Sequence, residues 1–295
     1  MIAGLAVFEP LRSRWLAAAP AAWIDEADAL AVARGLRAGS GARLRFRPEP
    51  AGTAGGAPGG AGAYERRIWT EGVVGCRTGG AGAAHDLHNA LAWLSLPATK
   101  AALNAIHVRA LARADAAGGA GRARSTPPGH RPRVRDFATL LDESGLLWVS
   151  RSADCDRALL AHDWSRLFVD RRAQLESSVF ALVLGHGLLH KLAKPYKSIT
   201  AHCLLLDARA IPGAGGAHAA PATGLPALPS GTPAAIAAID RAAAAALHGL
   251  GGDAARAPPA LQPLPVMGLP GWHPDNRDPA FFHDTRVFRP PRGHG

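Results

Sequence analysis

The sequence predicts an α+β fold: a mostly helical single domain with short β-hairpins and an irregular C-terminal arm docked on the core. Its 295 residues, 48% of them hydrophobic, are enough to bury a substantial core. Apolar residues recur at helical spacing over most of the stretch from 85 to 192. Strand-like segments are short and do not alternate with helices, so the pattern does not indicate a doubly wound parallel sheet.

Helices are predicted wherever the apolar spacing is close to 3.6 residues. Pro97 should divide one of these stretches, because proline inside a helix removes a donor and clashes with the preceding turn. Thr232 can cap a helix whose first residue is Pro233. The predicted helices cover Ala21–Leu36, His85–Asp115, Asp156–His162, Trp164–Leu192 and Pro233–His248.

Two hairpins are predicted from short apolar runs that flank turn residues. The first joins Tyr64–Trp69 to Val73–Arg77, and the second joins Phe137–Leu141 to Leu146–Ser150. In the second hairpin, Gly145 would take the positive φ that such a turn needs. A further strand is expected at 202–206.

Two low-complexity segments and a proline-rich end complete the predicted domain, which extends over 1–295. Ala51–Ala63 and Pro212–Ser230 are rich in Gly, Ala and Pro and are predicted to be removable surface loops. The arm 264–295 contains prolines that exclude a long helix, yet its many large apolar residues predict that it packs on the core.

Composition excludes some classes of protein. No apolar run is long enough to span a bilayer, and no signal peptide is evident, so the chain is expected to be cytoplasmic. The three cysteines have no spacing typical of a disulfide framework or a cysteine zinc site. The formal charge of +10 suggests nucleic acid as a partner, but only weakly. Arginines are spread along the chain, as a GC-rich genome would also produce.

His186 and His190 are four residues apart in a helical run, the spacing at which a helix presents two ligands to a single metal ion such as zinc. Gly187 stands where a zinc protease of the His-Glu-x-x-His type has its glutamate, which excludes that class. A third ligand must come from elsewhere: first His85, Asp86 or His88, then Asp142, Glu143, Asp275 or His283. The alternative is that His186 packs in the core and His190 lies at the surface.

A polar cluster opens the predicted helix at 85. His85 and His88 share one helical stripe while Asp86 and Asn89 share another, so at most half of the cluster can face one ligand. Asp86 is either a helix cap or, if it turns inward, a carboxylate that needs an Arg or His partner. Asp86 and Asn89 are candidate catalytic residues on this segment.

Two further groups of polar residues have both a functional and a structural interpretation. Asp142 and Glu143 are candidate catalytic residues, but as members of a hairpin loop they are more simply exposed turn formers. The stripe of Lys100, Asn104 and His107 could bind an anion, or could be a solvated helix face. No phosphate-binding glycine loop or serine-hydrolase elbow is present.

Several separated phrases resemble the bacterial domain-of-unknown-function family numbered 3025. They occur in order along nearly the whole chain: His85 to Trp93, Pro97 to Asn104, Arg135-Asp136, Asp142 to Gly145, Gly185 to Leu189, Pro270 to Asn276 and Asp284 to Pro290. The resemblance implies one cooperative unit, with no established activity or catalytic residues to carry over. It also implies that the two low-complexity loops are insertions.

Three functions therefore stay open from the sequence. The first is an enzyme, metal-assisted, with a pocket between the 186–190 helix and the 85–89 segment. The second is a non-catalytic basic protein that binds nucleic acid or another acidic partner. The third is a structural or scaffolding protein in which these polar residues serve the fold.

Overall fold

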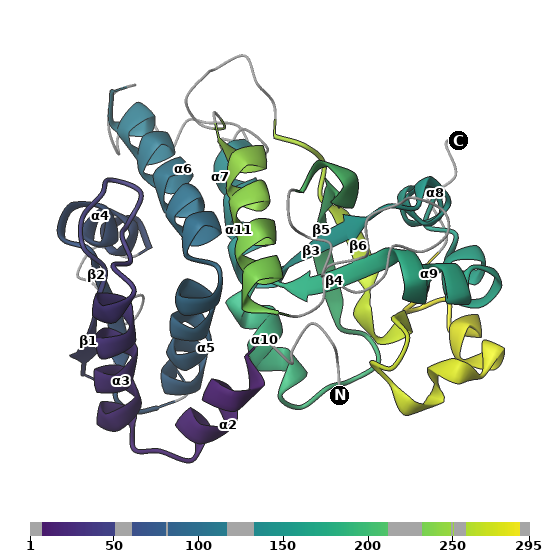
Figure 1. Cartoon of the computed structure of the whole chain (residues 1–295), viewed down its shortest axis with the longest axis horizontal. Helices are drawn as coiled ribbons and strands as arrows, with labels where there is room; N and C mark the ends of the chain where they lie inside the picture. Colours follow the sequence, from purple (N-terminus) through teal and green to yellow (C-terminus); the bar gives the residue numbers. More distant parts are fainter. Residues whose placement is uncertain are drawn as a thin grey trace.

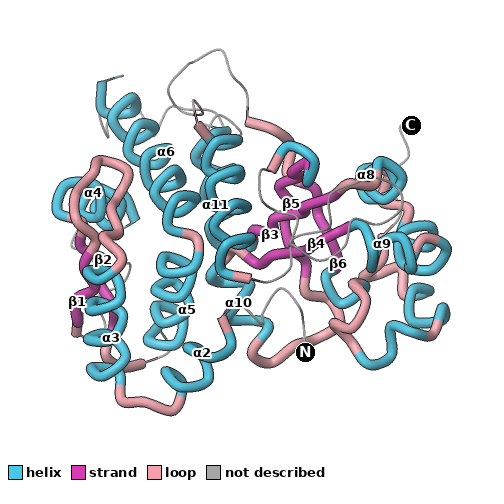
Figure 2. The backbone as a smooth tube through the Cα atoms, in the orientation of Figure 1, coloured by secondary structure: helices cyan, strands magenta, loops and turns pink. Residues whose placement is uncertain are grey.

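The structure is a computed structural model that describes residues 8–50, 61–80, 82–116, 133–211, 232–248, 250 and 258–289. It is an α+β fold made mostly of helices around one hydrophobic core cluster, with small sheets (Figures 1 and 2). The predicted fold class is confirmed. Among the described residues, no helix has both the length and the apolar character needed to cross a membrane.

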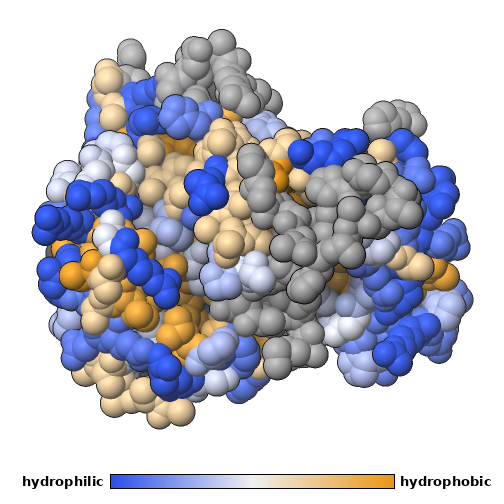
Figure 3. All heavy atoms as spheres, in the orientation of Figure 1, coloured by the Kyte–Doolittle hydropathy of each residue, from blue (hydrophilic) through white to orange (hydrophobic). Residues whose placement is uncertain are grey.

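The helical half contains the N-terminal elements and one helix from late in the chain, which packs against α6 (Figure 1). Its two short strands, β1 and β2, pair in parallel. Alanine-rich α11 gives this half a mildly apolar surface near the centre of Figure 3. The elements are α2 (Glu9–Leu16), α3 (Pro20–Ala33), β1 (Arg45–Glu49), α4 (Ala61–Glu71), β2 (Val73–Arg77), α5 (Gly82–Ser95), α6 (Pro97–Ala116) and α11 (Pro233–Leu247).

The other half is built on a four-stranded mixed sheet in the order β4-β3-β5-β6. Central β3 is buried throughout and pairs antiparallel with β4 and parallel with β5, while β6 pairs antiparallel with β5. The elements are α7 (Arg133–Ser144), β3 (Gly145–Ser150), α8 (Ala153–Leu160), η2 (Arg166–Asp170), α9 (Arg172–Ser178), β4 (Val179–Val183), α10 (His186–Leu192), β5 (Thr200–Asp207), η3 (Ala208–Ala210) and β6 (Gln262–Pro265).

Over residues 264–289 the C-terminal arm is docked, as predicted, while residues 290–295 lie outside the described part of the chain. After β6 it forms short 3-10 turns, η4 (Val266–Gly268), η5 (Pro274–Arg277) and η6 (Pro279–His283). Buried Asn276 donates its side-chain amide to the carbonyls of Met267 and Leu269, at 2.8 and 2.6 Å, and so ties the turns together. Phe282 stacks on Phe168 of η2 and Phe288 meets the same ring edge-on, with ring centroids 5.4 and 6.1 Å away. This aromatic contact anchors an arm that has little regular structure.

Several predicted helices are confirmed. Pro97 separates α5 from α6, and α3 ends before Gly35, which has φ +62°. Thr232 caps α11 by accepting a hydrogen bond from the backbone N–H of Ala235. The helix predicted over Trp164–Leu192 is wrong in its middle, where the apolar run Val179–Val183 forms β4.

Both predicted hairpins are wrong. Residues 64–69 are part of α4, and 137–141 are part of α7, so each apolar run that resembled a first strand is helical. In the second run, Phe137, Ala138 and Leu141 are buried while Leu140 is 42% exposed, which is a helical pattern. Gly145 opens β3 without a positive φ.

The two low-complexity segments cannot be compared with the structure over most of their length. Residues 51–60 and 212–230 lie outside the described residues. The remaining part of the first segment, residues 61–63, begins α4 and is not a loop.

Candidate metal centre

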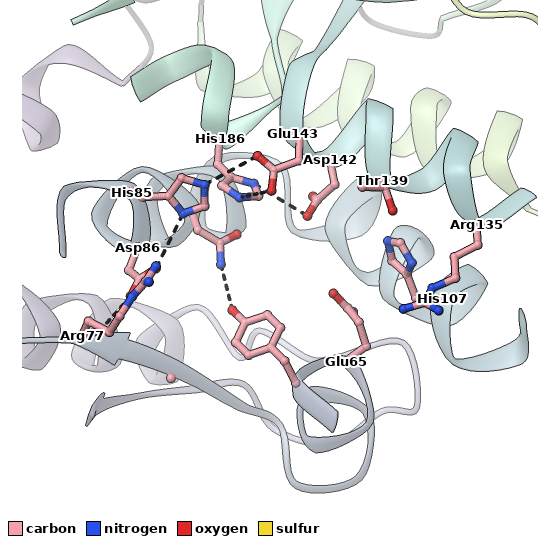
Figure 4. Close-up of a pocket in the computed structure, with 13 residues that line it drawn as sticks. Glu65, Arg77, His85, Asp86, His107, Arg135, Thr139, Asp142, Glu143 and His186 are labelled. Atoms are coloured by element: carbon pink, nitrogen blue, oxygen red, sulfur yellow. Dashed lines mark hydrogen bonds and ion pairs between the residues drawn. The ribbon is translucent and has the colours of Figure 1, made fainter. Parts of the chain in front are cut away.

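A cavity of about 200 Å³ lies where α4, β2, α5, α6, α7 and α10 meet. Most of its lining residues are polar or charged, and they include both acids and bases (Figure 4). It lies between the 85–89 segment and α10, where the sequence places a pocket. The lining residues are Tyr64, Glu65, Gly75, Arg77, His85, Asp86, Asn89, His107, Arg135, Thr139, Asp142, Glu143 and His186.

Glu143 lies between two histidines at one end of this cavity (Figure 4). Its Oε1 is 3.4 Å from Nε2 of His186, and its Oε2 is 3.5 Å from Nε2 of His85. One ligand atom from each of the three residues lies within 4.8 Å of the other two. Among the described residues, this is the one group of three or more His, Cys, Asp and Glu side chains compact enough for a single metal ion.

Backbone pairing fixes the positions of two of these residues, Glu143 and His186. Gly185 donates its N–H to the carbonyl of Gly145 at 2.9 Å, which holds the start of α10 against the end of α7. A Cβ at Gly185 would lie 2.6 Å from the carbonyl oxygen of Glu143, and one at Gly187 would lie 2.6 Å from its Oε2. The two helix ends can approach this closely because neither position carries a side chain.

Each histidine turns its second ring nitrogen toward an aspartate that is paired with a cation. Nδ1 of His186 is 3.6 Å from Oδ2 of Asp142, and Asp142 forms an ion pair with buried Lys100. On the other side, Nδ1 of His85 is 3.7 Å from Oδ1 of Asp86.

Arg77 holds Asp86 with three hydrogen bonds, from its backbone N–H, Nε and Nη2, at 2.8, 2.7 and 2.6 Å. Asp86 therefore faces inward with the arginine partner that a buried carboxylate requires.

These charges shift the protonation of the centre. The carboxylate of Asp86, followed by that of Glu143, raises the pKa of His85 to about 9. His186 and then His85 hold the pKa of Glu143 well below its usual range. Burial raises the pKa of Asp142, but Lys100 and His186 outweigh it and the net shift is downward. The carboxylates are therefore ionised at neutral pH, and His85 carries a proton.

His88 and His190 form a second, separate histidine pair, with ring centroids 5.4 Å apart. Nδ1 of His88 is 2.5 Å from the carbonyl oxygen of Ala84, and burial lowers the pKa of His88 to about 4. His190 is exposed. The structure thus groups His186 with His85 and Glu143, whereas the sequence pairs it with His190.

Other sequence-based interpretations change with the fold. Asp142 and Glu143 end a helix and face the cavity; they are not turn residues of a hairpin. Lys100, Asn104 and His107 are 3, 2 and 6% exposed, so the solvated helix face is wrong.

The remaining candidates divide between the cavity and the surface. Asn89 lines the cavity and donates its amide to the hydroxyl of Tyr64 at 2.9 Å. Asp275 and His283 lie in the C-terminal turns and are not part of the lining.

Some lining residues have no signal in the sequence. Glu65 lies in a segment predicted to be a strand, and Arg135 lies just upstream of the predicted hairpin strand 137–141. The charge of Asp86 indicates the need for a cation such as Arg77, but not which arginine supplies it.

The fold and cavity define a mixed α+β protein with a histidine-containing pocket that is lined by residues of α4, β2, α5, α6, α7 and α10. The chain belongs to the family described as "Protein of unknown function (DUF3025)", whose model matches residues 54–292. The match covers most of the chain and contains every residue that lines the cavity. No significant match was found among curated proteins or among solved structures.

Proposed function

We propose that this protein is a metal-dependent hydrolase in which His85, Glu143 and His186 hold one divalent ion, with zinc the best match. One observation carries the proposal: both imidazoles direct Nε2 at the same carboxylate while each Nδ1 faces its own aspartate. Histidine ligands of metals commonly have this arrangement, in which an outer carboxylate fixes the ring and its tautomer.

The distances between Glu143 and the two histidines suit an ion of the size of zinc. Ligand bonds of about 2.1 Å in a tetrahedral zinc site place neighbouring donor atoms about 3.4 Å apart. The separations between Glu143 and the two Nε2 atoms are 3.4 and 3.5 Å. These contacts are too long for good hydrogen bonds, and each of them, measured to its own oxygen of Glu143, is close to the length of one edge of such a tetrahedron.

Two histidines and one glutamate are a ligand set of catalytic zinc sites, and three protein ligands leave a position open for water. A bound zinc ion lowers the pKa of water to about 7 and polarises a carbonyl or phosphoryl oxygen. The cavity of about 200 Å³ beside the three ligands gives room for a small substrate. Hydrolysis requires no reactant besides the substrate and water.

Two aspartates, each paired with a cation, would hold the histidine ligands in position for the metal. Lys100 is 3% exposed and pairs with Asp142, so this carboxylate is held where it faces His186. Arg77 holds Asp86 in the same way beside His85. A closure of about 0.7 Å on each side would convert both Nδ1 contacts into hydrogen bonds to the aspartates.

Metal content tests the proposal directly. Full-length protein prepared without a polyhistidine tag or chelator should contain about one zinc ion per chain by plasma mass spectrometry. His85→Ala, Glu143→Gln and His186→Ala should each lose it. His190→Ala is the matched control, because His190 is on the same helix as His186 but belongs to the other histidine pair.

Activity is the second readout. The metal-loaded protein should hydrolyse members of a panel of small esters, amides and phosphate esters, lose this activity with chelator and regain it with zinc. The proposal fails if the wild-type protein takes up no divalent ion, or if His186→Ala retains the metal in a folded protein.

A further inference from the structure

We infer that the end of the cavity away from His85 binds an oxyanion, a carboxylate or phosphate group of the substrate, through Arg135 and His107. As a statement about substrate class, this inference rests on the proposed function. The binding of the anion itself does not require the metal. Figure 4 shows both side chains at the far end of the cavity from His85.

Arg135 is the available cation of the lining. Arg77, the other arginine there, is engaged by Asp86, whereas Arg135 forms no ion pair or hydrogen bond with any described residue. Its guanidinium can therefore offer its N–H donors to a ligand, and the fork geometry suits the two oxygens of a carboxylate or phosphate.

His107 supplies a second donor from another helix. It is 6% exposed and has no hydrogen-bond partner among the described residues, although it lines the cavity. A ring nitrogen of His107 can donate a hydrogen bond to a ligand in the cavity. His107 is a residue of α6, whereas Arg135 is a residue of α7.

Helix α7 connects this end to the metal centre. Arg135, Thr139 and Glu143 are spaced by four residues and all three line the cavity. Eight residues at 1.5 Å each separate the Cα atoms of Arg135 and Glu143 by about 12 Å. A substrate that reaches both ends thus carries its acidic group at one end and the bond that is hydrolysed at the other.

The carboxylate of Glu65 lies at the same end of the cavity and repels an anion there, which provides a further test of the subsite. One of its carboxylate oxygens, Oε2, accepts a hydrogen bond from the Asn104 amide at 2.7 Å. Its negative charge still weakens the attraction between Arg135 and an anionic ligand. Removing that charge should therefore tighten anion binding, while removing the charge of Arg135 should weaken it.

Calorimetric titration of the full-length, chelator-treated protein with inorganic phosphate and with acetate tests the subsite. Arg135→Gln should weaken binding of phosphate, acetate or both by about tenfold to a hundredfold, the range for a hydrogen bond to a charged group. Glu65→Gln should tighten it. Arg166→Gln removes the same charge from an exposed arginine of η2 and should change nothing.

The inference is overturned if neither anion binds the wild-type protein, if Arg135→Gln binds both as well as wild type does, or if Glu65→Gln weakens binding. His186→Ala separates it from the metal proposal. This variant should lose the metal and keep the anion affinity. Anion binding without any metal uptake contradicts the proposed hydrolase alone, and metal uptake with anion binding insensitive to Arg135 contradicts the subsite alone.

Discussion

The substitution Lys100→Met tests how the proposed metal centre is supported by residues around its ligands. Lys100 is buried on α6, forms an ion pair with Asp142, and lies 5.5 Å from the ring centroid of Trp93. Methionine keeps the length and apolar stem of the side chain but removes the cation. Asp142, whose side chain is 15% exposed, is then left as a buried carboxylate without its main partner.

Removing one partner of a buried ion pair costs about 3–5 kcal/mol, because the remaining charge loses its compensation. At about 2 °C per kcal/mol for a chain of this size, the melting temperature should fall by about 6–10 °C. The loss should also weaken metal binding by about tenfold to a hundredfold, since Asp142 positions the imidazole of His186.

The pH dependence of the stability loss in Lys100→Met shows whether the broken ion pair causes it. The pKa of Asp142 is lowered in the folded wild-type protein, so its ion pair stabilises the fold above the unfolded pKa of about 3.9 and is lost as the pH falls. In Lys100→Met the pKa of Asp142 must rise, because burial remains and the cation is gone. The difference in stability between the two proteins should be full at pH 7 and shrink toward pH 4.

Denaturant unfolding at several pH values and a double-mutant cycle with Asp142→Asn provide the measurement. The double variant should recover part of the stability lost in Lys100→Met, because a neutral amide replaces the uncompensated carboxylate. A stability loss that is independent of pH, or that simply adds to that of Asp142→Asn, would refute the reasoning and leave Lys100 as a packing residue.

Three further predictions concern protons, a helix cap and the arm. The pKa of His85 is about 9, so zinc binding at pH 7.5 should release about one proton, and the affinity for zinc should rise with pH up to about 9. Calorimetry in buffers of different ionisation enthalpy measures this proton release, and finding no release would contradict the prediction. Asp240→Ala removes a buried carboxylate that accepts the N–H groups of Ala98 and Thr99 at the start of α6, so chemical unfolding should show a loss of about 2–3 kcal/mol, with metal content unchanged. Truncation before Leu264 should lower the melting temperature or cause aggregation, because it removes the aromatic cluster on Phe168; a soluble product with unchanged melting would refute the docked arm.

The fold class could be predicted because helical periodicity extends over long segments, while strand signals are short. The two hairpins could not, since a run of a few apolar residues fits either period. Tyr64 and Ile68, for example, suit an alternating strand face and are also one helical turn apart. The choice depends on tertiary partners: 73–77 pairs with Arg45–Glu49, a segment that the sequence does not mark as its neighbour.

The region of the site could be predicted, but not the grouping within it. Polar clusters at 85–89, 142–143 and 186–190 identify segments with chemical capacity, and the cavity lies among them. The pairing of particular side chains depends on how the end of β4 is hydrogen-bonded beside Gly145, which no local pattern encodes. The position of Glu143 beside both histidines follows from that contact. The sequence predicts a turn residue at this position only because it predicts a hairpin there.

The two histidine pairs explain why a spacing of four residues is not enough to identify a metal site. Helices α5 and α10 lie side by side, and they bring together His85 with His186 and, one turn further, His88 with His190. In the described structure only the first pair meets a carboxylate, that of Glu143, and the pKa of His85 rises to about 9. His88 has no such partner, and burial lowers its pKa to about 4. The acid at the end of α7 is therefore what distinguishes the pair that we propose as metal ligands from the other pair.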